Sequence, residues 1–133
     1  MLFTTKTEYG MRAMVALAKN GKEDPLSLAQ IAKIEHISQS YLERLFKKLK
    51  ADGLVKSIKG ASGGYVLTRK PKEINMFEIV EALEGSLAVF YCIGDNQRKM
   101  ICSSQRCLTK RVWDQIQKNT IATLRKFTLA DLV

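Results

Sequence analysis

The chain has 133 residues, 46% of them hydrophobic, and its 22 Lys plus Arg against 13 Asp plus Glu give a net charge of +9. This composition excludes a disordered tail, and no run approaches the roughly 18 apolar residues that a membrane span needs. No apolar leader precedes the first charged residue, so we expect a small cytoplasmic domain with no membrane partner. The basic excess favours a nucleic-acid partner, with a merely solubilising surface as the alternative.

Helical patterns dominate the chain, and short polar motifs predict where the helices begin. Thr5 with Glu8, and Ser27 with Gln30, have the spacing of capping boxes at the first two helices. Asn75 opens a later helix in the same way. The predicted helices span 5–20, 28–34, 38–52, 75–85 and 108–126.

The third of these helices is amphipathic. A brief turn around His36 precedes it, and we interpret this single histidine as a turn residue rather than a ligand. Ser38 or Ser40 is expected to cap the helix, and Gly53 to end it. The apolar stripe at helical spacing consists of Leu42, Leu45, Phe46 and Leu49.

Two β-prone runs, 54–58 and 65–68, flank a glycine-rich stretch and predict a hairpin. The glycines let the backbone approach a phosphate or enter a minor groove, and Lys59 supplies positive charge. A phosphate-binding loop is excluded because no Gly-Lys-Ser/Thr follows and the stretch joins a strand to a strand. A plain flexible hairpin remains the alternative.

The order helix, short helix, turn, helix and hairpin is that of a winged helix-turn-helix, whose second helix enters the DNA major groove. The predicted fold class is therefore mainly α with one β-hairpin. We divide the chain into a DNA-binding domain over 1–85, a cysteine-containing loop over 86–107 and a long C-terminal helix with a final turn over 108–133.

Polar and basic side chains on the outer face of the third helix are of the types that read base edges or hold phosphates. Glu43 only accepts hydrogen bonds, so near DNA it would favour a cytosine amino group and repel phosphate. The alternative is an ordinary surface helix with solvated charges. The candidate DNA-binding residues are Ser38, Gln39, Ser40, Tyr41, Glu43, Arg44 and Lys47 on the helix, and Lys59 and Gly60 at the hairpin tip.

Three cysteines, Cys92, Cys102 and Cys107, are separated by nine and four residues. Three thiolates in a loop-rich stretch fit an iron–sulfur cluster or zinc, whereas the lack of a Cys-x-x-Cys pair keeps buried or incidental thiols as the alternative. A metal site would need a fourth ligand from another side chain, the partner subunit or a small molecule. No residues have the pattern of a catalytic constellation, so we do not expect an enzyme.

Five stretches resemble the IscR/NsrR family of bacterial winged-helix repressors. They are TKTEYG at 5–10, ISQSYLERLF at 37–46, GLVKSIKGASGGY at 53–65, CLTKRVW at 107–113 and FTLADLV at 127–133. The resemblance covers essentially the whole chain, and the helix and hairpin motifs are its most specific part. It implies a homodimer, joined mainly by the long helix within 108–133, that binds a pseudo-palindromic operator in double-stranded DNA.

The resemblance also implies an iron–sulfur cluster on the three cysteines, with the iron–sulfur assembly machinery as its donor. In IscR-like members the fourth ligand is a histidine three residues after the last cysteine, but Lys110 stands there and its ammonium group is a poor ligand. In NsrR-like members it is a carboxylate near the N-terminus, where this chain has Glu8. We therefore predict Glu8, donated by the partner subunit, as the fourth ligand, with helix capping as its other role.

The predicted function is a DNA-binding repressor whose cluster senses iron–sulfur or iron status, redox state or nitric oxide. The resemblance favours a 2Fe–2S over a 4Fe–4S cluster, although the long gap between the first two cysteines leaves the type open. One alternative is a cluster-free regulator of the same fold that responds through a protein partner, such as an enzyme of cysteine metabolism. Another is a small iron–sulfur redox protein, which would need no DNA-reading helix.

Overall fold

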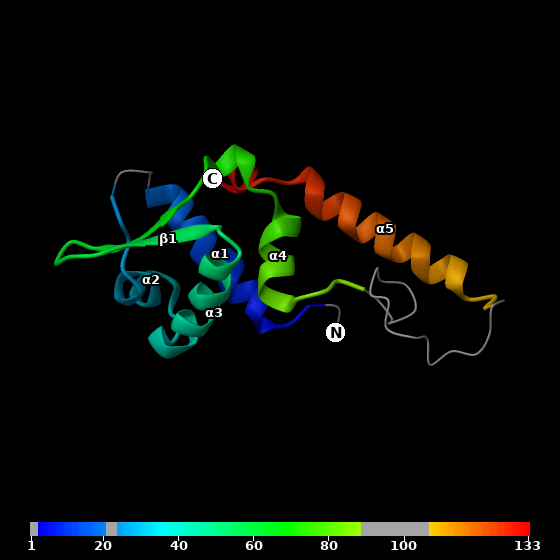
Figure 1. The fold of residues 1–133 in the computed structure, drawn as a ribbon, viewed down its shortest axis with the longest axis horizontal. Coiled ribbons are helices and arrows are strands. Elements are labelled where there is room, and N and C mark those ends of the chain that lie inside the picture. The colour runs from blue at the N-terminus through cyan, green and yellow to red at the C-terminus, as the bar shows by residue number, and fades with distance from the viewer. Residues whose placement is uncertain (1–2, 21–23, 89–106) are drawn as a thin grey trace.

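A computed structural model describes residues 3–20, 24–88 and 107–133 of the chain, and it confirms the mainly helical class with one hairpin (Figure 1). The helices are α1 (Thr5–Asn20), α2 (Leu28–Glu35), α3 (Gln39–Ala51), α4 (Met76–Glu84) and α5 (Lys110–Lys126). The strands are β1 (Val55–Ile58) and β2 (Gly64–Leu67), and two short 3-10 helices are η1 (Pro71–Glu73) and η2 (Leu129–Leu132). Within the described residues, no helix is long and apolar enough to cross a membrane.

Two of the predicted capping boxes are confirmed. The Ser27 hydroxyl accepts from the Gln30 backbone N–H over 3.1 Å, and the Gln30 side chain accepts from the Ser27 N–H over 2.8 Å. Asn75 and Glu78 make the same reciprocal pair at the start of α4, with lengths of 3.0 and 3.1 Å. Each box satisfies backbone donors that the helix itself leaves unpaired.

The predicted box at the first helix is wrong by one residue. The carbonyl of Thr4 accepts the first helical bonds, from the N–H groups of Thr7 and Glu8. The Thr4 hydroxyl also accepts from the Lys6 N–H over 3.2 Å, which makes Thr4 the cap and Thr5 the first helical residue. Glu8 is thus released from the capping role, and its side chain pairs with Arg12 instead.

A single core lies between α1, α3 and α4. The predicted stripe of α3, formed by Leu42, Leu45, Phe46 and Leu49, is fully buried, and α4 contributes Met76, Ile79 and Leu83 to the same core cluster. Gly10 lets α1 approach α4 closely, because a Cβ at that position would lie 2.3 Å from a methyl group of Leu83. The core therefore holds α3 rigidly, with its polar face directed outward.

The hairpin projects from the body at the end opposite α5 (Figure 1). Its strands are antiparallel, with Val55 opposite Leu67, and Gly60 at the tip has a φ of 118° that favours glycine. Tyr65 fastens the hairpin to the body by a two-way backbone bridge to Leu26 and an edge contact with the Phe46 ring at 4.8 Å. This is the wing of a winged helix.

The last residues of the chain return to the helical body formed by α1, α3 and α4, a feature that no local sequence pattern indicates. After α5, the backbone of Thr128 forms a bridge with Asn75, and Leu129 is completely buried in the core. The Arg125 guanidinium lies 4.5 Å from the centre of the Phe77 ring. The C-terminal end of α5 is thereby attached to the start of α4, while its N-terminal end extends away from the body (Figure 1).

Candidate nucleic-acid interface and cysteine segment

The outer face of α3 presents most of the residues predicted to contact DNA. The exposed ones are Ser38, Gln39, Ser40, Glu43, Arg44 and Lys47. Ser38 is the helix cap, accepting from the Tyr41 N–H over 3.4 Å, and its hydroxyl also lies 2.9 Å from that of Ser40. Ser38 rather than Ser40 is therefore the cap of α3. The remaining exposed residues of this face point toward the solvent.

Tyr41 differs from its neighbours because it is half-buried against α1. Its hydroxyl lies 3.2 Å from the Thr5 hydroxyl, and its ring makes an edge contact with Tyr9 at 5.8 Å. These contacts tie the beginning of α3 to the first turn of α1. Tyr41 therefore supports the orientation of the helix, and its hydroxyl lies in an exposed contact with α1.

The wing tip carries Lys59 and Gly60, both exposed. An open polar groove of about 530 Å³ separates the wing tip from the start of α2, with Ser27 and Gly63 among its lining residues. Lys50, at the end of α3, donates to the Ser57 hydroxyl over 3.1 Å, so helix and wing are also linked by side chains. Exposed basic groups therefore lie both at the wing tip, with Lys59, and on the outer face of α3, with Arg44 and Lys47.

Glu8 lies exposed on the first turn of α1, 3.9 Å from the Arg12 guanidinium. The same guanidinium is 3.1 Å from the Glu35 carboxylate and also donates to the Glu35 backbone carbonyl. Glu35 is the last residue of α2, and His36 after it adopts a left-handed conformation with φ of 55° that turns the chain toward α3. Arg12 therefore connects the candidate ligand Glu8 to the helix-turn-helix turn, a link the sequence did not reveal.

Cys107 precedes α5 and is exposed, whereas Cys92 and Cys102 lie outside the described residues. The Cys107 sulfur and the Thr109 hydroxyl are 3.2 Å apart. The hydrogen bond from that hydroxyl, joined by backbone N–H groups and the charge of Lys110, lowers the pKa of the Cys107 thiol below its ordinary value. Thiolate, the form that binds metals, is thereby favoured. Within the described parts, no cluster of three or more His, Cys, Asp or Glu is placed to hold a metal ion.

The Rrf2 family model, described as an iron-dependent transcriptional regulator, matches residues 3–133 of this chain. The chain belongs to the Rrf2 family of transcriptional regulators. It is 35% identical over all 133 residues to the HTH-type transcriptional regulator IscR of Serratia proteamaculans, of which the match spans 79%. The IscR/NsrR resemblance is thereby confirmed, and like its Rrf2 relatives the protein is a DNA-binding regulator rather than an enzyme.

Two solved structures of Rrf2 regulators share the fold. CymR, the global cysteine regulator of B. subtilis, superposes with a TM-score of 0.82 at 35% identity, covering 98% of this chain and 94% of its own. IscR of T. potens superposes with a TM-score of 0.79 at 38% identity, covering 97% and 83%. The winged-helix assignment is confirmed by both, and the chain is similar to regulators with two different names.

Proposed function

We propose that this Rrf2 regulator acts as a homodimer whose binding to a pseudo-palindromic operator is controlled by an iron–sulfur cluster. The observation that carries the proposal is the exposed Cys107, with its pKa lowered, at the start of a helix that carries an exposed apolar stripe. In this account residues 1–85 bind DNA, 86–107 hold the cluster, and 108–133 dimerise. The signal is iron or iron–sulfur status, redox state or nitric oxide, and the protein acts as a repressor in the cytoplasm.

DNA binding is assigned to the outer face of α3 and to the wing tip. Gln39, Glu43 and Arg44 stand on the exposed face that a recognition helix turns toward base edges. Lys59 and Gly60 reach the backbone or the minor groove beside it. Because the apolar stripe of α3 is fully buried, the helix has only this one face to offer.

The dimer is assigned to α5, and the occupant of its apolar face is a second copy of the chain. Leu108 in the turn before α5, and Val112 and Ile116 within the helix, recur every fourth residue and expose 94%, 57% and 40% of their surface. A groove of about 540 Å³ runs beside Val112 and Ile116. A helical stripe of this kind is the pattern by which two helices pack, and an isologous contact would give the two-fold symmetry of a palindromic site.

The donor set suits an iron–sulfur cluster. Cys107 is accessible and the pKa of its thiol is lowered, and Cys92 and Cys102 complete three cysteines of the type such clusters require. Within one chain, the first turn of α1 and the start of α5 are well separated (Figure 1), which supports the assignment of Glu8 of the partner subunit as fourth ligand. When bound, the cluster supplies a centre whose charge and ligation change with oxidation or loss of iron.

Control of DNA binding follows from what Glu8 touches. The guanidinium of Arg12 pairs with the carboxylates of both Glu8 and Glu35. If Glu8 binds the cluster, Arg12 therefore pairs with Glu35 alone, at the end of α2. Thr5, in the same first turn, contacts Tyr41 at the beginning of α3. A displacement of the first turn of α1 therefore reaches α3 through both Arg12 and Tyr41. In this account the dimers with and without the cluster place their two α3 helices differently, and so they differ in operator affinity.

The test is anaerobic purification followed by Mössbauer and resonance Raman spectroscopy of the wild type and of Glu8→Ala. We expect a brown protein, iron signals of a single cluster type, and an altered ligand signature in Glu8→Ala. Arg12→Ala provides a matched control, because it removes the partner of Glu8 and leaves all four proposed ligands. A colourless, iron-free wild type would contradict cluster binding, and an unchanged spectrum in Glu8→Ala would exclude that ligand.

A second candidate is a cluster-free regulator that responds through a protein partner. The observation in its favour is the superposition with CymR, described as a regulator of cysteine, over nearly the whole of both chains. Anaerobic purification also distinguishes this candidate from cluster control, because a cluster-free regulator would be colourless and would bind its operator with full affinity. The redox-protein alternative is disfavoured by membership of a family of transcriptional regulators.

A further inference from the structure

We propose that Arg69 and Glu78 form a positioning pair that sets the angle of the wing against the junction where α5 rejoins the body. The role presupposes that the wing contacts DNA, as proposed above. It adds a route by which the dimerisation helix influences DNA binding without acting through α3. Neither residue belongs to the predicted set of DNA-binding residues.

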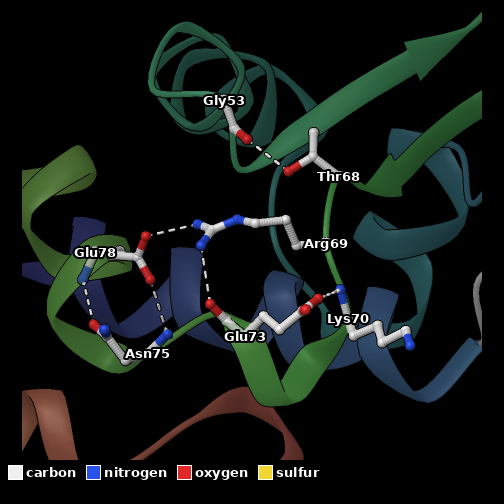
Figure 2. A network of polar contacts seen from close by, with 7 residues as sticks. All are labelled: Gly53, Thr68, Arg69, Lys70, Glu73, Asn75 and Glu78. Atoms are coloured by element: carbon white, nitrogen blue, oxygen red, sulfur yellow. Dashed lines mark hydrogen bonds and ion pairs between the residues drawn. The ribbon is translucent and has the colours of Figure 1, made fainter.

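Arg69 follows β2 closely and makes two directed hydrogen bonds (Figure 2). One guanidinium nitrogen donates to the Glu78 carboxylate over 2.6 Å, and another donates to the Glu73 carbonyl over 2.9 Å. Two bonds from one planar group fix its direction as well as its position. The adjacent Thr68 hydroxyl donates to the Gly53 carbonyl over 2.6 Å, so the base of the wing is held at two points.

Glu78 is itself held in place by its second role. One carboxylate oxygen accepts from the Asn75 backbone N–H over 3.1 Å and completes the capping box of α4, while the other accepts from Arg69. Figure 2 shows both bonds leaving the same carboxylate. The ion pair is therefore formed with a carboxylate already fixed by the helix terminus, unlike most pairs of flexible surface charges.

The C-terminal end of α5 attaches to residues 74–78, the segment that contains Glu78. The backbone bonds that make this attachment join Met76 N–H to the Phe127 carbonyl over 2.9 Å and Leu129 N–H to the Ile74 carbonyl over 3.0 Å. Phe77, next to Glu78, receives the guanidinium of Arg125 on its ring. A change in the angle of α5 thus moves residues 74–78, and Arg69 passes that movement to the end of β2.

The competing explanation is that Arg69 binds a DNA phosphate directly. The two accounts predict opposite signs for Glu78→Gln. A glutamine at this position still completes the capping box, so the helix start is kept while the ion pair loses its charge. If Arg69 were a phosphate ligand, releasing it and removing a negative charge would strengthen DNA binding. If it positions the wing, binding to the specific site weakens.

The experiment titrates wild type, Arg69→Gln, Glu78→Gln and the double variant with a duplex that the wild type selects from a random-sequence library. A non-specific duplex of the same length is titrated in parallel over a range of salt concentrations. We expect each single variant to lose about fivefold in specific affinity, the double variant to lose no more, and the salt slope to stay at the wild-type value. Lys70→Gln, whose ammonium group points away from the network in Figure 2, controls for the lost charge.

Tighter binding by Glu78→Gln would overturn the proposal, as would a salt slope that falls by about one in Arg69→Gln. An equal loss in Lys70→Gln would also overturn it, because charge alone would then explain the effect. The variant Lys59→Ala distinguishes failure of the positioning pair from failure of the proposed contact between the wing and DNA. If Lys59→Ala weakens binding and Glu78→Gln does not, only the positioning pair fails; if Lys59→Ala has no effect, the wing contact itself fails.

Discussion

The carboxylate of Glu84 accepts a hydrogen bond of 2.7 Å from the hydroxyl of Thr7, 77 positions earlier in the chain. The same oxygen accepts from the N–H and hydroxyl of Thr4, over 2.9 and 2.7 Å. Beside it, Lys48 of α3 donates to the Leu83 carbonyl over 3.2 Å. The last turn of α4 therefore joins the start of α1 and α3 just before α4 ends at Gly85.

Glu84 should make stability depend on pH. Burial raises the pKa of its carboxyl, but the hydrogen bonds from Thr4 and Thr7 outweigh that effect and hold the pKa below its ordinary value of 4.5. A pKa lowered by folding contributes stability above the ordinary value, and this contribution is lost as the pH falls through the lowered one. We expect Glu84→Gln to reduce the free energy of unfolding by about 1–2 kcal/mol at neutral pH, measured by urea denaturation.

The difference between Glu84→Gln and wild type should shrink as the pH falls through the lowered pKa of the folded state, because the wild-type carboxyl in the folded protein then also becomes neutral. Glu81→Gln is the control, since Glu81 lies exposed on the same helix. It should change stability by less than about 0.5 kcal/mol. A difference that stays constant with pH would show that the charge of Glu84 plays no part.

The thiol of Cys107 should react as a thiolate at lower pH than an ordinary cysteine. In cluster-free protein with Cys92→Ser and Cys102→Ser, the alkylation rate by iodoacetamide plotted against pH reports its pKa. Thr109→Val removes the hydroxyl that contributes most to lowering that pKa, so we expect the midpoint to move upward. Thr120→Val, on the same helix, should leave it in place. Identical midpoints in all three proteins would refute the role of Thr109.

An acidic residue on the apolar face of α5 should prevent the proposed dimer from forming without unfolding the chain. Val112→Glu places a charge on a side chain that is 57% exposed, so the monomer tolerates it while a packed interface would bury it. Light scattering should give a monomer with an unchanged circular dichroism spectrum and a loss of affinity for a two-half-site duplex. Lys118→Glu, an exposed position elsewhere on α5, is expected to remain dimeric. A dimeric Val112→Glu would mean that another surface forms the contact.

The reading helix and the wing should respond differently to substitution. Glu43→Ala is expected to alter base preference, with loss of discrimination for cytosine of about 1–3 kcal/mol at one position. Arg44→Ala and Lys59→Ala should weaken binding to most sequences and reduce the salt slope by about one each. Selection from a random duplex library and salt titrations measure the two effects. Uniform losses across all sequences for Glu43→Ala would contradict its assignment.

Local patterns predicted much of the fold, because capping boxes and apolar periodicity act within a few residues. Ser27 with Gln30 is an example, since both partners of each bond lie in one turn. The prediction failed at Thr5, where Thr4 offers the same hydroxyl one position earlier and the structure uses that one. Motif spacing favoured Thr5, because only Thr5 has a glutamate three residues later, whereas a contact outside the local motif holds Thr4 at the helix start: its N–H and hydroxyl both donate to Glu84.

The links between distant elements were not predictable from local patterns. Arg12 with Glu35, and Arg69 with Glu78, bring together charges from separate elements, and many other pairs of the same charges were equally compatible with the sequence. The return of Leu129 to the core is likewise a long-range packing event. The exposure of most candidate DNA-binding residues on α3 was easier to predict, because burying the apolar stripe of an amphipathic helix turns its polar face outward.

The most direct test of cluster control compares operator binding by one preparation before and after the cluster is removed anaerobically. Fluorescence anisotropy with the selected duplex gives the dissociation constant of each form, and Cys92→Ala supplies a form that lacks one proposed ligand. We predict that the two cluster-free samples agree with each other and differ from the intact protein by at least about fivefold in specific affinity. Equal affinity in all three samples would contradict the account.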